Sequence, residues 1–224
     1  MQITRLQREA LMTAITSGYI LPIRLNNKGA ELLSQGKILE SRVLFVEALN
    51  YTKSTTAELQ KHLPRNKKAV TLQFHFLTPI PIAGDSEAFI FKRPVKLLEK
   101  KEVGDCMALA GNVTTAIVFN MSLSFHVQGL TDSQHLKKAI AGYEILMSVR
   151  KHGRGAVNKL LDLGLLNNIA EIHLERSAYE SATSYFTKLA FLLRHLNNVD
   201  LDVVELDGFM MGALWQVPVC AGAA

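Results

Sequence analysis

The residue types that most often do chemistry in proteins occur in this chain without the spacing that chemistry needs. Its two cysteines, Cys106 and Cys220, lie far apart, and neither belongs to a CxxC or Cys/His pattern of the kind that binds metals. The seven histidines form no HExxH motif, and Gly153-Arg-Gly155 lacks the Lys and Ser/Thr that end a phosphate-binding loop. We therefore expect no catalytic residue, no metal and no cofactor, and we expect that the protein is not an enzyme.

Asparagine and basic side chains are the remaining candidates for a functional site, because both can bind another molecule without reacting with it. The 224 residues are 48% apolar and 20% charged, which is typical of a globular protein that folds throughout. The N-terminal stretch 1–25 is interrupted by Arg5, Arg8 and Glu9, so it lacks the continuous apolar core of a secretory signal. Together with the two distant cysteines, this favours an intracellular, cytoplasmic protein. An organellar transit helix is the alternative that its arginines leave open.

A stretch without Asp, Glu, Lys or Arg runs from Cys106 to Thr131. It is longer than the roughly 18 residues that a membrane span needs. Polar residues interrupt it throughout, and a helix facing lipid would have to bury them unfavourably. We expect a buried central helix here and no membrane span.

The spacing of apolar residues predicts helices at both ends of the chain. Capping signals delimit the later helices. One helix begins near Asp132 or Ser133, and the next one ends at about Glu175. Two further helices run from about Tyr179 to Leu196 and from Asp202 to Trp215. Between the two helical parts, alternation with period two predicts strands over 70–76 and 88–94. The connection 77–87 contains two prolines and a Gly-Asp pair, which is typical of a turn. We expect an antiparallel two-stranded β-hairpin, inserted over 64–104.

Three segments share one pattern of small and large residues. Measured from Gly29 and from Ala170, the aligned positions fall at +3, +7, +12, +16 and +19 in both copies, and they are Leu32, Gly36, Ser41, Phe45 and Ala48 in the first and His173, Ser177, Ala182, Phe186 and Leu189 in the second. A third copy contains Ser122, Phe125, Ala139 and Tyr143, with an insertion around Gly129 to His135 that delays Ala139 by five residues. The pattern resembles that of the tetratricopeptide repeat (TPR) family.

The resemblance implies a mainly α fold in which antiparallel helix pairs form a short right-handed solenoid, here a single domain over 1–224 that carries the hairpin. The overall pattern, with the hairpin and the alanine-rich end, also resembles TPR-like proteins of unicellular algae. The function implied is that of a protein–protein interaction scaffold or adaptor, which binds a peptide or partner protein in its concave groove. The sequence names no particular partner.

Each copy also has an asparagine two residues before its small position: Asn27, Asn120 and Asn168. The resemblance implies that these asparagines face the groove and bind a peptide, and an amide can both donate to and accept from an extended backbone. In the alternative interpretation, each amide bonds to a neighbouring helix and only holds the stack together. If they bind the partner, replacing all three by alanine should abolish partner capture and change the melting temperature little.

The excess positive charge is confined to one region. Residues 54–101 contain nine basic and four acidic residues, which accounts for the whole net charge of +5. The candidate basic surface lies close in sequence to Phe74, Phe89 and Phe91, and it consists of Lys67, Lys68, Lys92, Arg93 and Lys96. Basic groups with exposed aromatic rings can bind nucleic acid, which is the alternative function. A charged edge that discourages strand aggregation is the other interpretation of the same residues.

Overall fold

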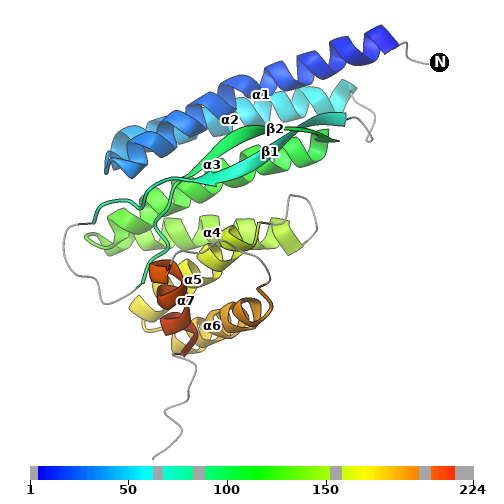
Figure 1. Ribbon diagram of the computed structural model, residues 1–224. Helices are drawn as coiled ribbons and strands as arrows, with labels where there is room; N and C mark the ends of the chain where they lie inside the picture. Colours follow the sequence, from blue (N-terminus) through cyan, green and yellow to red (C-terminus); the bar gives the residue numbers. More distant parts are fainter. Residues whose placement is uncertain (1–4, 63–67, 83–88, 152–157, 197–202, 215–224) are drawn as a thin grey trace, which may run out of the picture. The chain divides into compact units, whose positions relative to one another are not determined.

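A computed structural model describes residues 5–62, 68–82, 89–151, 158–196 and 203–214 (Figure 1). Within these residues the protein is mainly α with one two-stranded antiparallel sheet, as the sequence predicts, and it contains seven α-helices. The chain divides into two compact units. Unit 1 comprises Met1–Ile82 and Arg93–Ala156, and unit 2 comprises Ala83–Lys92 and Val157–Ala224. The short segment 83–92 thus belongs to unit 2, although the residues on both sides of it belong to unit 1.

Unit 1 contains two pairs of packed helices. Helix α1 (Arg5–Ser34) packs along α2 (Ile38–His62), and α3 (Cys106–Gly129) packs along α4 (Leu136–Lys151), as Figure 1 shows. Helix α2 also contacts α3, so that the two pairs are joined. The pairing agrees with the repeat pattern read from the sequence.

Gly29 and Phe45 show why the first pair needs a small residue opposite a large one. A Cβ atom added to Gly29 would lie only 2.6 Å from Cε1 of Phe45. The phenylalanine ring therefore rests directly on the backbone of α1. Between the helices, Gly36 adopts a left-handed conformation with φ +76°, and Lys37 N donates to Leu32 O at 2.9 Å. This turn satisfies carbonyl groups that the end of α1 leaves unpaired.

The second pair carries the longer turn that the sequence predicts. After α3 ends at Gly129, Asp132 caps a short 3₁₀ helix, η1 (Ser133–His135), by accepting a hydrogen bond from Gln134 N. Helix α3 is largely buried, as expected. Its segment Ala108–Gly129 is long and apolar enough to cross a membrane by length and composition, and 72% of its apolar window is buried inside the protein.

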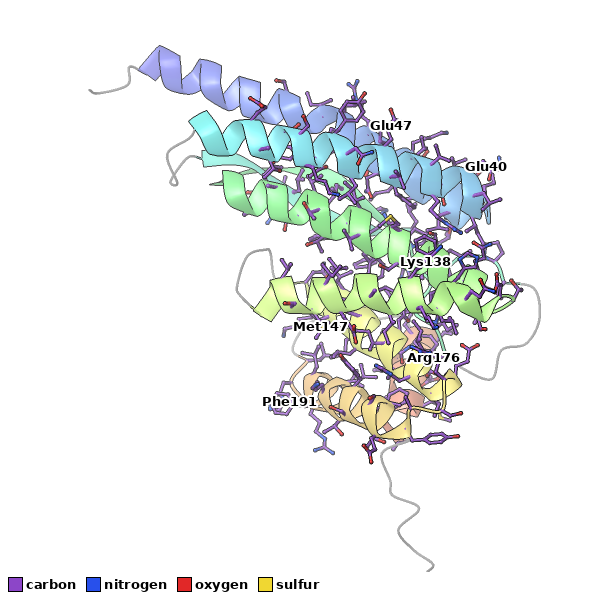
Figure 2. The ribbon with its side chains drawn as sticks, turned by 180° about the vertical axis from the view of Figure 1, so that it is seen from behind. Glu40, Glu47, Lys138, Met147, Arg176 and Phe191 are labelled. Atoms are coloured by element: carbon purple, nitrogen blue, oxygen red, sulfur yellow. The ribbon has the colours of Figure 1, made fainter. Side chains whose placement is uncertain are left out.

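The sheet of unit 1 lies on one face of the helices (Figure 1), and Figure 2 shows the opposite face, where Glu40 and Glu47 of α2 are exposed. Strand β1 (Lys68–Phe76) pairs with β2 (Val95–Asp105), with Phe76 opposite Val95 and an irregularity between Val70 and Thr71. Apolar side chains of the strands are buried in the core, and they include Leu72, Phe74, Val95 and Leu97. The first predicted strand is confirmed.

The second predicted strand, 88–94, is wrong, because pairing with β1 begins only at Val95. Pro94 has no N–H to give to a ladder, although its carbonyl accepts from Leu77 N at 2.8 Å. The described residues before it, from Phe89 on, belong to no strand. Their main chain is bound in unit 2 instead.

Unit 2 contains α5 (Lys159–Glu175), α6 (Tyr179–Arg194) and α7 (Val203–Leu214), in close agreement with the predicted helices. The turn between α5 and α6 repeats that of the first pair. Ser177 is left-handed at φ 56°, and Ala178 N donates to His173 O at 2.8 Å. Helix α7 packs against α6 and α5 and contributes the fully buried Phe209.

Candidate functional site

Asn120 of α3 binds both polar main-chain groups of one residue in β2. Its Oδ1 accepts from Val95 N at 2.7 Å, and its Nδ2 donates to Val95 O at 2.8 Å. Nδ2 also donates to Oδ1 of Asn26 at 3.0 Å, while Nδ2 of Asn26 reaches Val95 O at 3.1 Å. Asn26, Asn120 and Val95 are all fully buried. This part of β2 is therefore sealed from water and bonded to α1 and α3 at once.

Asn27 of α1 repeats this arrangement two residues further along β2. Leu97 N donates to its Oδ1, and its Nδ2 donates to Leu97 O, both at 2.8 Å. Main-chain groups of consecutive residues in a strand point to opposite sides, so those of Val95 and Leu97, two residues apart, share one edge of β2, the edge away from β1. An unpaired edge of this kind is a template for another strand. Here the asparagines of the helices occupy the place that a third strand would take.

The same bonding occurs in unit 2 around Asn168 of α5. Its Oδ1 accepts from Phe91 N at 2.8 Å, and its Nδ2 donates to Phe91 O at 2.9 Å. The adjacent Asn167 donates from Nδ2 to Phe89 O at 2.7 Å. Both asparagines are fully buried. Segment 89–92 is thus held on α5 by side-chain amides.

The three asparagines singled out in the sequence share one role in the structure: each binds the N–H and the C=O of a single extended residue. Asn27 and Asn120 act together in unit 1, and Asn168 acts in unit 2. The extended residues belong to the same chain. Sequence reasoning missed Asn26 and Asn167. A signal was present, since the repeat copies that begin near Gly29 and near Ala170 both contain an Asn-Asn pair at the same place.

Phenylalanine side chains fix the segment in unit 2. Phe91 is 1% exposed, and a Cβ added to Gly164 would lie 2.3 Å from its ring. A Cβ added to Gly208 would lie 2.2 Å from the ring of Phe89. Both rings contact Phe209, with centroids 5.1 Å from Phe89 and 5.6 Å from Phe91. Bare glycine backbone on two helices therefore makes room for two aromatic rings.

The basic residues are engaged in part within the protein. Arg93 donates from Nε to Leu77 O at 2.9 Å and from Nη2 to Phe76 O at 3.2 Å. Lys96 Nζ lies 2.7 Å from Oε1 of Glu31, and this hydrogen bond lowers the pKa of the Glu31 carboxyl. Lys92 is half-buried. Lys67 and the side chain of Lys68 lie outside the described part of the chain.

The aromatic residues close to this basic region are not displayed for stacking on bases. Phe74 and Phe91 are 6% and 1% exposed, and Phe89 packs on Phe209. A surface that binds single-stranded nucleic acid needs accessible rings. The environment of these three rings therefore gives no support to base stacking.

Buried titratable groups lie elsewhere on the helices. Burial of His126 on α3 lowers its pKa to about 3, and its Nδ1 has no hydrogen-bond partner. Burial of Glu171 on α5, aided by the charge of Glu175, raises its pKa to about 7. Among the described residues, no group of three or more His, Cys, Asp or Glu could hold a metal ion. The asparagine sites offer hydrogen bonds to a main chain and no reactive group.

Comparison of the chain with protein-family models, with curated proteins and with solved structures finds no match.

Proposed function

We propose that the protein is a non-enzymatic, intracellular scaffold of the TPR-like kind, in which helix pairs stack into a short right-handed solenoid and bind a protein partner. Three observations support the TPR-like interpretation. The helices pack in pairs where the repeat pattern expects them, α1 with α2, α3 with α4 and α5 with α6. Gly36 and Ser177 occupy equivalent positions in two copies, and both are left-handed. The equivalent asparagines bond in the same way.

The observation that carries the proposal is the two-fold hydrogen bonding of each asparagine to one extended residue. A side-chain amide that donates to C=O and accepts from N–H recognises main chain regardless of sequence, while neighbouring pockets select side chains. Asn27, Asn120 and Asn168 each do this, to Leu97, Val95 and Phe91 respectively. The segment that they hold supports an extended peptide with apolar side chains as the ligand.

Affinity purification with the full chain as bait tests the proposal. We expect protein partners that remain after nuclease treatment and in about 0.5 M salt, because recognition of main chain by buried amides depends little on phosphate charge. Nucleic-acid binding through the basic region 54–101 would instead weaken steeply with salt. Partners that disappear on nuclease treatment, or none above the matrix control, would overturn the scaffold proposal.

A further inference from the structure

Unit 2 contains a complete binding site for a short extended segment. We infer that this site takes a peptide with two phenylalanines separated by one residue, a Phe-x-Phe peptide, and that Phe89–Phe91 occupies it as an internal ligand that a partner's peptide replaces. The inference rests on the proposed scaffold function and names the partner's chemistry. The site lies wholly within unit 2, on α5 and α7, and its occupant is the segment 89–92.

The main-chain half of the site is formed by the Asn167-Asn168 pair. Asn168 binds the N–H and C=O of Phe91, and Asn167 binds the C=O of Phe89. Asn167 is 0% exposed, and its buried Oδ1 atom has no hydrogen-bond partner. An unpaired buried acceptor is unfavourable. A peptide whose N–H groups reach both amides would satisfy it, so the internal ligand leaves part of the site unused.

The side-chain half of the site selects flat rings. Gly164 and Gly208 leave backbone exposed to Phe91 and Phe89, and any larger residue at either position would strike the ring. Phe209 contributes an edge-on contact to Phe89, with an interplanar angle of 83°. Such contacts between aromatic rings favour phenylalanine over an aliphatic side chain of similar volume.

The two parts of the bound segment differ in how firmly they are fixed. Val95 and Leu97 belong to β2, where β1 bonds one edge and the asparagines bond the other. Residues 89–92 belong to no strand, and the asparagines of α5 hold them through Phe89 and Phe91. The part in unit 2 can therefore leave its site without loss of the sheet. An internal ligand competes at an effective concentration of about millimolar, so the intact protein should bind an external peptide less tightly than a variant whose internal ligand is removed.

A peptide-binding experiment on the full chain tests this inference. The probe is a fluorescent synthetic peptide with the sequence of residues 87–94, Glu-Ala-Phe-Ile-Phe-Lys-Arg-Pro. The double substitution Phe89→Ala with Phe91→Ala removes the internal anchors, and we expect it to bind the peptide at least about tenfold more tightly than wild type. Adding Asn168→Ala should abolish the gain. A peptide with both phenylalanines replaced by alanine should not bind.

Two controls keep the test decisive. Phe191→Ala removes an exposed phenylalanine of α6, labelled in Figure 2, and should bind the peptide as wild type does. Phe91→Leu keeps an apolar side chain, so this variant should fold even if the double variant does not. Its gain in affinity for the peptide should be smaller than that of the double variant. No gain in either a folded double variant or Phe91→Leu would overturn the inference. If protein partners are still captured in that case, the scaffold proposal survives and the partner uses another surface.

Discussion

Asn120 binds both main-chain polar groups of Val95, at 2.7 Å and 2.8 Å, and both residues are fully buried. A single amide thus takes the place of a neighbouring strand at an edge that would otherwise be unpaired. Asn27 does the same for Leu97. The asparagines therefore contribute to the fold of unit 1.

Replacing Asn120 by alanine should destabilise the protein by roughly 2–6 kcal/mol, because Val95 N and Oδ1 of Asn26 each lose a buried hydrogen bond at a cost of about 1–3 kcal/mol, while Val95 O keeps its bond from Asn26. Urea unfolding followed by circular dichroism measures the change. The matched control is Asn50→Ala on the exposed side of α2, which should stay within about 0.5 kcal/mol of wild type. Equal stability of the Asn120 and Asn50 variants would contradict the bonding described.

This result would also revise the sequence-based prediction for the triple alanine variant. That prediction assumed amides that face the binding groove, for which the melting temperature should change little. Because Asn120 and Asn168 are fully buried and bonded to the same chain, we now expect loss of stability. Partner capture by such a variant must accordingly be compared at a temperature where it is still folded.

Gly36 and Ser177 occupy the same position in two copies of the repeat, and opposite substitutions at the two positions test whether their turns are equivalent. Ser177→Gly should stabilise the protein by about 0.5–1 kcal/mol, since glycine adopts positive φ without strain. Gly36→Ala should destabilise the protein by about 1 kcal/mol, because alanine is strained at positive φ. A clash would not contribute, since the added Cβ would lie 3.6 Å from its nearest neighbour, Cγ of Pro81. Thermal unfolding measures both. A change of the same sign in the two variants would argue against equivalent turns.

His126 should make the protein less stable in acid. Its pKa is about 3 when folded and 6.5 when exposed, so between these values the unfolded chain binds the extra proton and stability falls as pH decreases. The loss from pH 6.5 to pH 5 is about 2 kcal/mol. His126→Leu should reduce this loss, whereas the exposed control His75→Leu should not. An unchanged pH profile in the His126 variant would rule out the buried, neutral imidazole.

Glu171 should make the protein less stable as the pH rises, the opposite of the effect of His126. Its pKa is raised from 4.5 to about 7, so the folded chain holds the proton longer than the unfolded one, and stability falls as pH rises through this interval. Glu171→Gln should therefore stabilise the protein at pH 8 by about 1–3 kcal/mol relative to wild type and have little effect at pH 4.5. Glu180→Gln, an exposed change on α6, serves as the control. Equal effects of Glu171→Gln at both pH values would contradict the raised pKa.

The helices and the equivalent asparagines could be predicted from sequence, because periodicity and capping are local signals. The offsets from Gly29 and Ala170 also located the left-handed turn residues Gly36 and Ser177. The second strand was misplaced, since residues 88–94 alternate as a strand does, while their partner is decided by α5, far away in sequence. No local pattern indicates that asparagines will bind the main chain of the same protein.

The central claim is that helix asparagines hold the extended segment Phe89–Leu97, and amide hydrogen exchange followed by NMR tests it most directly. We expect slow exchange for the amides of Phe91, Val95 and Leu97, whose N–H groups donate to asparagine Oδ1 atoms. Asn27→Ala should accelerate exchange at Leu97 and leave Phe91 protected. Fast exchange of all three amides in the wild-type protein would contradict the account.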